Sequence, residues 1–146
     1  MLTEAFLNGE ALRSYCQRNS IPIWEAMIQR EMKLSEQPRE ALLLEMQRNL
    51  EVMREAVQEG LEFRNASVSG LSGGDAEMLY RYAKLDPFSG TIACRAAASA
   101  MAVVEVNAAM GRIVAAPTAG ASGILTGVLI ESAKRRNWSD EQLVRG

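Results

Sequence analysis

The chain has 146 residues, with 16 Lys and Arg, 18 Asp and Glu, and a net charge of −2. This length suits one domain of ordinary size. The near-neutral charge gives no electrostatic reason to expect a nucleic acid or an anionic membrane as a partner. Because the chain contains no His, Ser-His-Asp triads, Cys-His pairs and His-ligated metal sites are excluded.

The two cysteines, Cys16 and Cys94, limit the metal chemistry of one copy of the chain. They cannot supply the four thiolates of a typical iron–sulfur cluster or of a zinc ribbon. They are also too few for a disulfide scaffold, so a cytoplasmic location is expected. No signal peptide or membrane span is predicted, because residues 1–9 carry no basic region and the most apolar window, residues 91–104, is short and contains Arg95.

The first half of the chain is predicted to be helical. Ser20 is a candidate N-cap for a helix whose first turn holds Pro22, and apolar residues follow at helical spacing. A second helix is expected to begin at Pro38 and to end at Gly60. Its apolar stripe consists of Leu43, Met46, Leu50, Met53 and Val57. This pattern predicts a helical hairpin that packs on a core, and a face for a coiled-coil partner is the alternative.

The second half begins with a polar, glycine-rich stretch at residues 65–75. Asp75 is a candidate N-cap for a helix over residues 76–85. The Ala- and Ser-rich segment 91–110 is predicted to be the central helix, because small side chains allow neighbouring helices to approach closely, and Gly111 can end it.

The remaining segments complete an all-α prediction with little or no sheet. Ser122 is the candidate N-cap of a helix over residues 123–136, and a capping box at residues 139–142 predicts one more helix. Residues 111–117 form the only short extended candidate.

We expect one helical domain over residues 1–146, with a hairpin region at 1–65 and a glycine-loop region at 66–146. The chain stops directly after the capping box, which suggests a truncated domain. Such a domain is expected to expose apolar surface and to self-associate.

The sequence SGLSGGD at residues 69–75 is the first candidate binding segment. Glycines let a ligand approach the main chain, and successive free N–H groups can bind a carboxylate or a phosphate. The segment is not a P-loop, because no Lys follows at the required spacing. A flexible linker is the alternative. The candidate ligand-binding residues of this segment are Ser69, Gly70, Ser72, Gly73, Gly74 and Asp75.

The second candidate binding segment is residues 107–123, NAAMGRIVAAPTAGASG. The planar guanidinium of Arg112 suits a carboxylate, and the helix that follows Pro117 can bind an anion at its N-terminus. The alternatives are a structural ion pair between Glu105 and Arg112 and a simple capping role for Ser122. The residues assigned here are Asn107, Arg112, Pro117, Thr118, Gly120, Ser122 and Gly123.

The lysines argue against pyridoxal phosphate as a cofactor. That cofactor requires a Schiff-base Lys in its pocket, and neither glycine-rich segment contains a Lys. Lys84 is the nearest one in sequence, but no phosphate-binding loop surrounds it. We therefore expect no pyridoxal phosphate.

These segments, taken together, resemble one family. Residues 25–61, the SGLSGGD segment and residues 105–129 resemble the N-terminal part of the α chain of bacterial iron–sulfur L-serine dehydratase, an L-serine ammonia-lyase. The resemblance covers nearly the whole chain, in order. It implies conversion of L-serine to pyruvate and ammonia, a β chain as partner, and a [4Fe–4S] cluster that acts as a Lewis acid.

The resemblance also implies where the metal lies. The family's cluster-ligating cysteines are downstream in the α chain, beyond residue 146, and neither Cys16 nor Cys94 matches them. This chain is therefore expected to hold no metal, to lack an identifiable catalytic base and to be inactive alone. The alternatives outside enzymes are a helical interaction module and a small-anion binding domain.

Overall fold

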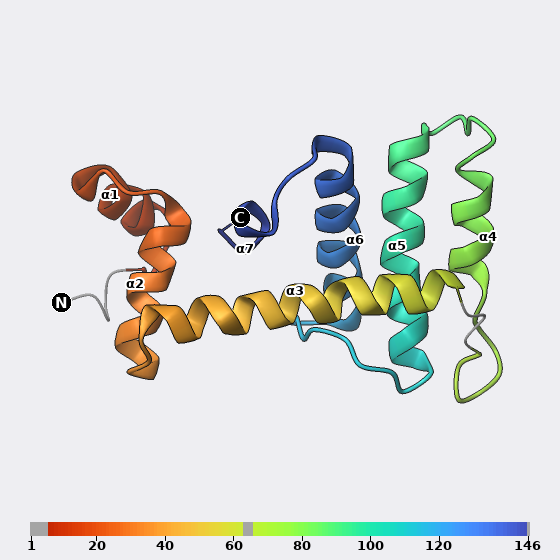
Figure 1. Cartoon of the computed structure of the whole chain (residues 1–146), viewed down its shortest axis with the longest axis horizontal. Coiled ribbons are helices and arrows are strands. Elements are labelled where there is room, and N and C mark those ends of the chain that lie inside the picture. The colour runs from red at the N-terminus through yellow and green to blue at the C-terminus, as the bar shows by residue number, and fades with distance from the viewer. Residues whose placement is uncertain (1–5, 63–65, 146) are drawn as a thin grey trace. The chain divides into compact units, whose positions relative to one another are not determined.

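The structure is a computed structural model that describes residues 6–62 and 66–145. It confirms the all-α prediction, because these residues form seven helices and no strand (Figure 1). The helices are α1 (Gly9–Asn19), α2 (Ile23–Ser35), α3 (Arg39–Glu62), α4 (Asp75–Tyr82), α5 (Thr91–Ala108), α6 (Ala119–Arg136) and α7 (Asp140–Arg145). None of the helices in the described residues is both long and apolar enough to cross a bilayer.

The chain forms two compact units. The first comprises Met1–Arg48 and Asp140–Gly146, and the second comprises Asn49–Ser139. The boundary between the units lies within α3, since one uninterrupted helix contributes residues to both.

In the first unit, the helix that was predicted to begin at Ser20 begins later, after the turn between α1 and α2. Ser20 is not an N-cap: it has a left-handed φ of 53° and donates its N–H to the carbonyls of Cys16 and Gln17, which closes α1. Pro22 takes the N-cap position of α2 with an extended backbone. A polar residue such as Ser begins a helix when its backbone is extended and can end one when its backbone is left-handed, so residue type alone did not separate the two roles.

A network of charged and aromatic side chains ties α2 to the start of α3. Arg39 donates two hydrogen bonds to the carboxylate of Glu25, at 2.9 and 2.7 Å. The guanidinium of Arg39 also lies over the ring of Trp24, 5.7 Å from its centroid, and that of Arg145 from α7 lies 5.0 Å from the same centroid. The bonds from Arg39 hold the pKa of Glu25 below its ordinary value.

The lowered pKa gives a pH-dependent stability prediction. A carboxyl whose pKa is lower in the folded state stabilises the fold above its ordinary pKa, and this contribution is lost as the pH falls through the folded value. Glu25→Gln should therefore lower the melting temperature at pH 7, while at pH 3 the variant and the parent chain should melt closer together. Thermal melts by circular dichroism at both pH values check this, and an equal difference at both would contradict it.

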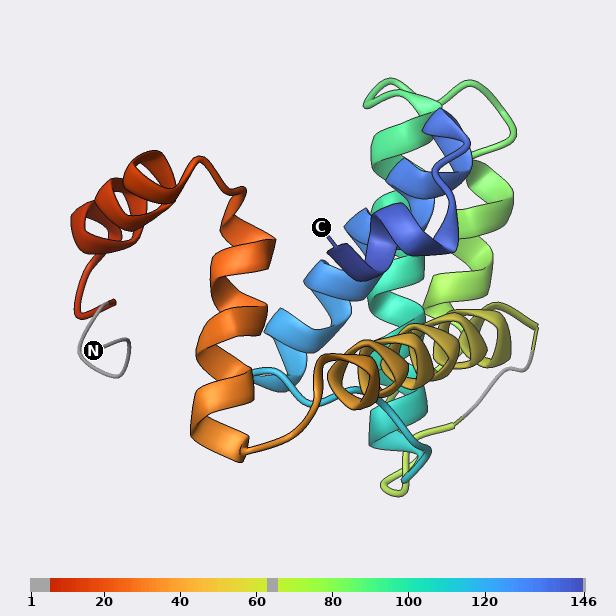
Figure 2. The same ribbon diagram turned by 60° about the vertical axis from the view of Figure 1, so that its left-hand side comes forward.

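In the second unit, α5 lies between α4 and α6 and contacts both (Figures 1 and 2). Ala98, Ala102 and Val106 of α5 are fully buried, which confirms the prediction of a central helix. The α3 part of this unit packs on α5 through a cluster of buried residues, Ala56, Val57, Val103 and Val106. This packing holds α5 in place, and the loops that precede α4 and α6 lie next to it.

Two glycines bring the backbones of α5 and α6 into direct contact. A Cβ at Gly123 would lie 2.6 Å from the carbonyl oxygen of Ala100, and a Cβ at Gly127 would lie 2.6 Å from that of Ala96. Distances under 3.0 Å to backbone atoms cannot be relieved by a side-chain rotation. The small residues of both helices therefore permit an approach that larger side chains would prevent.

Gly60 was predicted to end the long helix, and this prediction is wrong. α3 continues through Gly60 to Glu62, and a Cβ at Gly60 would lie 2.7 Å from the Cα of Ala102 on α5. The glycine is required by close helix packing and not by a helix end. Residues 111–117, the extended candidate, form no strand.

Candidate functional site

The SGLSGGD segment leads directly into α4. Gly74 is the N-cap of α4, with a φ of 87° that favours glycine, and Asp75 is the first helical residue. The prediction that the Asp75 side chain caps this helix is therefore wrong. The structure gives the N-terminal N–H groups of α4 a different acceptor.

That acceptor is the carboxylate of Glu105, from the buried face of α5. Its two oxygens accept hydrogen bonds from the backbone N–H groups of Gly74, Asp75 and Ala76, at 2.9, 2.9 and 3.0 Å. Only 8% of Glu105 is exposed. The N–H groups that the sequence suggested for a ligand anion are thus occupied by a carboxylate of the chain itself, and Glu105 is not the partner of Arg112.

The rest of this loop is held by its own hydrogen bonds. Ser67 donates its N–H to the carbonyl of Ser72 at 2.8 Å, and Gly70 donates its N–H to that of Ser67 at 2.8 Å. Val68 donates its N–H to the carbonyl of Ala108, the last residue of α5, at 3.1 Å. The hydroxyl oxygens of Ser67 and of the predicted site residue Ser69 lie 3.1 Å apart. These bonds argue against the alternative of a flexible linker.

The second candidate segment forms the start of α6. Thr118 is the N-cap, and its hydroxyl accepts the N–H of Ala121 at 3.0 Å. Ser122, predicted to be the cap, lies inside the helix and is buried. Its hydroxyl accepts the N–H of Ala116 at 2.9 Å and donates to the carbonyl of Thr118 at 3.2 Å. The hydroxyl of Thr118 therefore caps α6, and the hydroxyl of Ser122 ties the loop before α6 to the first turn of that helix.

Both segments line one pocket of about 350 Å³. Ser72 and Asp75 contribute from the first segment, and Gly120 contributes from the second. The remaining wall is mostly apolar and comes from α5 and α6. It consists of Ala100, Met101, Val104, Glu105, Ala108 and Ile124. We call this hollow the loop pocket. Three of the predicted site residues are thus brought together by the fold.

Other predicted site residues lie outside the lining of the loop pocket. Arg112 is largely exposed and donates to the carboxylate of Glu55 on α3 at 2.7 Å. Asn107 is exposed near the end of α5, whereas Gly123 is buried against Ala100. The members of the predicted set that do not line the pocket are Ser69, Gly70, Gly73, Gly74, Asn107, Arg112, Pro117, Thr118, Ser122 and Gly123.

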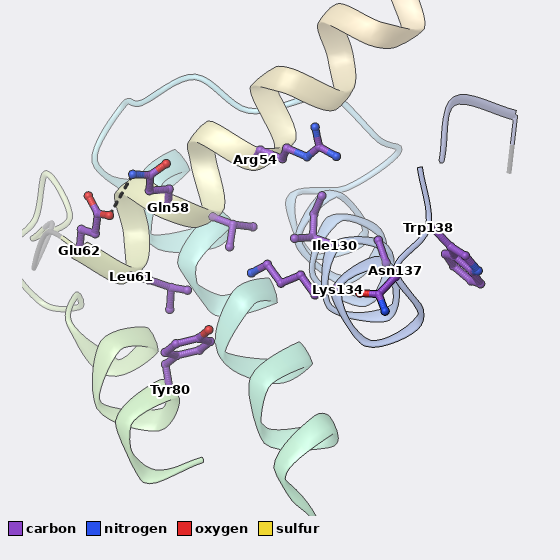
Figure 3. A pocket seen from close by; sticks show the side chains of 11 residues that line it. Arg54, Gln58, Leu61, Glu62, Tyr80, Ile130, Lys134, Asn137 and Trp138 are labelled. Atoms are coloured by element: carbon purple, nitrogen blue, oxygen red, sulfur yellow. Dashed lines mark hydrogen bonds between the residues drawn. The ribbon is translucent and has the colours of Figure 1, made fainter. Parts of the chain in front are cut away.

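A second hollow, of about 650 Å³, was missed from the sequence. It lies among α3, α4 and α6, and Leu61, Tyr80 and Lys134 reach toward it from these three helices (Figure 3). Its remaining lining is Arg54, Val57, Gln58, Glu62, Ile130, Ala133, Asn137 and Trp138. The ammonium of Lys134 already bonds the buried carboxylate of Glu131 at 2.7 Å. No sequence motif marks this hollow, because its lining comes from three separate helices and from Asn137 and Trp138, which follow α6.

The cysteines do not fit an iron–sulfur cluster. Cys94 is buried on α5, with its sulfur 3.0 Å from the hydroxyl of Ser89, while Cys16 belongs to the other compact unit. In the described part of the chain, no three Cys, Asp or Glu side chains come together as metal ligands. A cluster therefore cannot be assigned to these residues.

Comparison with known proteins identifies the family. Residues 18–146 match the family described as serine dehydratase alpha chain. The chain belongs to this family. Both glycine-rich segments and the loop pocket lie within the matched residues, and the resemblance inferred from the sequence is confirmed.

Two curated serine dehydratase chains are similar to it. The probable L-serine dehydratase, alpha chain, of Bacillus subtilis (strain 168) is 40% identical over 141 residues, which cover 96% of this chain and 47% of that protein. The L-serine dehydratase, alpha chain, of Peptoniphilus asaccharolyticus is 30% identical over 132 residues, which cover 90% of this chain and 45% of that protein. The chain thus spans about half the length of these relatives. No solved structure matches it.

Proposed function

We propose that the chain is the N-terminal part of an L-serine ammonia-lyase α chain and that the loop pocket holds L-serine. Family membership supports the reaction, the conversion of L-serine to pyruvate and ammonia. The observation that carries the placement is that Ser72 and Asp75 share one pocket with Gly120. Two glycine-rich segments more than 30 residues apart in sequence converge there, each at the start of a helix.

The charges around the pocket support one orientation of the substrate. Glu105 and Asp75 place carboxylates on the α4 side of the pocket, which favours the substrate's ammonium group there. The first turn of α6 contributes Gly120 on the other side, and a helix N-terminus favours a carboxylate. Arg112 and Asn107 have no part in this proposal, because they do not line the pocket.

The proposal limits what these residues do to substrate binding. Because the cysteines of this chain do not fit the [4Fe–4S] cluster that the resemblance implied, we place the cluster ligands in the remaining length of the α chain. The names of the relatives refer to an alpha chain, and we propose a β chain as the partner that completes the enzyme.

Activity of the complete enzyme tests the proposed function. The full-length α chain, purified with its β chain in the absence of oxygen, should form pyruvate from L-serine and contain iron. Pyruvate is measured by coupled reduction with lactate dehydrogenase and NADH. A preparation that retains iron but forms no pyruvate from L-serine would contradict the proposal.

A further inference from the structure

We propose that Glu105 is a positioning residue of the loop pocket. Its carboxylate holds Asp75 in place and makes the α4 side of the pocket selective for a ligand with an ammonium group over one without. This inference rests on the proposed function, because it takes the loop pocket to be the substrate site. Glu105 was considered in the sequence only as a partner for Arg112, and its actual role depends on contacts 29 to 31 residues away.

The burial of Glu105 shows that its contacts are specific. The residue is only 8% exposed, and a buried carboxylate is costly unless it is fully bonded. Three backbone N–H groups and the positive end of α4 supply that bonding. The carboxylate and the helix start therefore stabilise each other.

The same helix fixes the loop at both of its ends. Glu105 holds the C-terminal end, at Gly74 and Asp75, and the carbonyl of Ala108 holds the N-terminal end through the N–H of Val68. Glu105 and Ala108 are three residues apart, about one turn of α5. Between these two anchors the loop bonds mainly to itself, so the position of Asp75 depends directly on Glu105.

The charge of Glu105 has a second consequence. A helix N-terminus normally attracts anions, but the N–H groups at the start of α4 already hold an anion. A ligand carboxylate is therefore excluded from those N–H groups and repelled from that side of the pocket, while an ammonium group is attracted. The pocket is thereby made asymmetric, with only the α6 side left to attract the carboxylate.

Another buried glutamate provides a matched control. Glu131 of α6 is 4% exposed and accepts hydrogen bonds from the hydroxyl of Ser99, at 3.1 Å, and from Lys134, at 2.7 Å. It does not line the loop pocket. Replacing either glutamate with Gln removes one buried negative charge at almost constant volume, so a general loss of stability would appear in both variants.

The first measurement is hydrogen–deuterium exchange in the complete two-chain enzyme. In Glu105→Gln, the amide nitrogen cannot accept an N–H bond, and exchange across residues 66–82 should become faster. In Glu131→Gln, exchange in this segment should match the parent enzyme. Equal exchange of this segment in all three proteins would overturn the positioning role, whatever their activity.

The second measurement compares two inhibitors that differ in one group. L-alanine carries an ammonium group where L-lactate carries a hydroxyl, and neither has the hydroxyl that leaves from L-serine. The ratio of their competitive inhibition constants should favour L-alanine in the parent enzyme and in Glu131→Gln. It should fall about tenfold in Glu105→Gln, about 1.4 kcal/mol. An unchanged ratio would overturn the selective role.

A third variant, Glu105→Asp, separates the positioning role from the selective role. It also replaces Glu105→Gln in both measurements if that variant does not assemble. It keeps the charge but shortens the reach, so it should speed exchange in residues 66–82 while largely keeping the preference for L-alanine. Slow exchange in this variant would overturn the positioning role, and a lost preference would overturn the selective one. If the parent enzyme binds neither inhibitor, the selective role fails, and if it forms no pyruvate from L-serine, the proposed function fails. In both cases the exchange measurement still decides the positioning role.

Discussion

Replacing Asp75 with Ala in the complete enzyme is expected to lower kcat/KM for L-serine about a hundredfold, about 2.7 kcal/mol of transition-state binding. Asp75 is the first residue of α4 and lines the loop pocket together with Glu105. Its backbone N–H bonds to Glu105, which leaves the side chain carboxylate as the group that can face the substrate's ammonium. Steady-state pyruvate formation measures the change.

The control for this prediction is Asp86→Asn, which removes one negative charge beyond the other end of α4. Asp86 is exposed and has a left-handed φ of 55°, a conformation that Asn tolerates well. This variant should keep kcat/KM close to that of the parent enzyme. If Asp75→Ala retains both its iron and a near-normal kcat/KM, the loop pocket is not where the substrate's ammonium binds.

Replacing Gly127 with Ala is expected to destabilise the fold by about 3 kcal/mol. The added Cβ would lie 2.5 Å from the backbone nitrogen of Ala100 and 2.6 Å from the carbonyl oxygen of Ala96. Because both are backbone atoms of α5, the two helices must separate and lose packing along their shared face. A melting temperature lower by about 10 °C would follow for a chain of this size.

Gly120→Ala is the matched control within α6. A Cβ at Gly120 would meet only the hydroxyl of Thr118, at 3.9 Å, so Ala should be neutral or slightly stabilising through its higher helix propensity. Calorimetry of the two variants checks the pair. Equal melting temperatures would show that the α5–α6 contact is not as close as the structure describes.

The helical character of the chain was predictable because apolar residues recur at helical spacing, which is a local property of the sequence. The stripe from Leu43 to Val57 repeats at helical spacing, and its later members Leu50, Met53 and Val57 are buried as expected. Met46 is 47% exposed, because the amount of burial along a stripe depends on which partner covers each turn. The central position of the Ala-rich helix was also predictable, because its small side chains indicated close packing against neighbouring helices.

The helix boundaries were less predictable, because the same residue types serve opposite roles. Ser20 closes a helix where it was expected to open one, and Gly60 permits close packing where it was expected to end one. In both cases the role of the residue is decided by what it contacts, which is the last turn of α1 for Ser20 and helix α5 for Gly60. Local propensity does not encode such a contact.

The candidate site was predictable in part, for the same reason. The two glycine-rich segments were found from the sequence, and the structure brings Ser72, Asp75 and Gly120 to one pocket. The roles of Glu105 and Arg112 were not found, since Glu105 bonds the start of α4 and Arg112 bonds Glu55, which is 57 residues away. A sequence shows which charges are present, but only the fold shows which of them meet.

The position of bound L-alanine in a crystal structure of the complete enzyme tests the central claim most directly. L-alanine keeps the ammonium and carboxylate groups of L-serine but lacks the hydroxyl that leaves. The account predicts that it occupies the loop pocket, with its ammonium beside Asp75 and its carboxylate at the start of α6 near Gly120. Well-defined density for L-alanine at another site, with only water between Asp75 and Gly120, would contradict it.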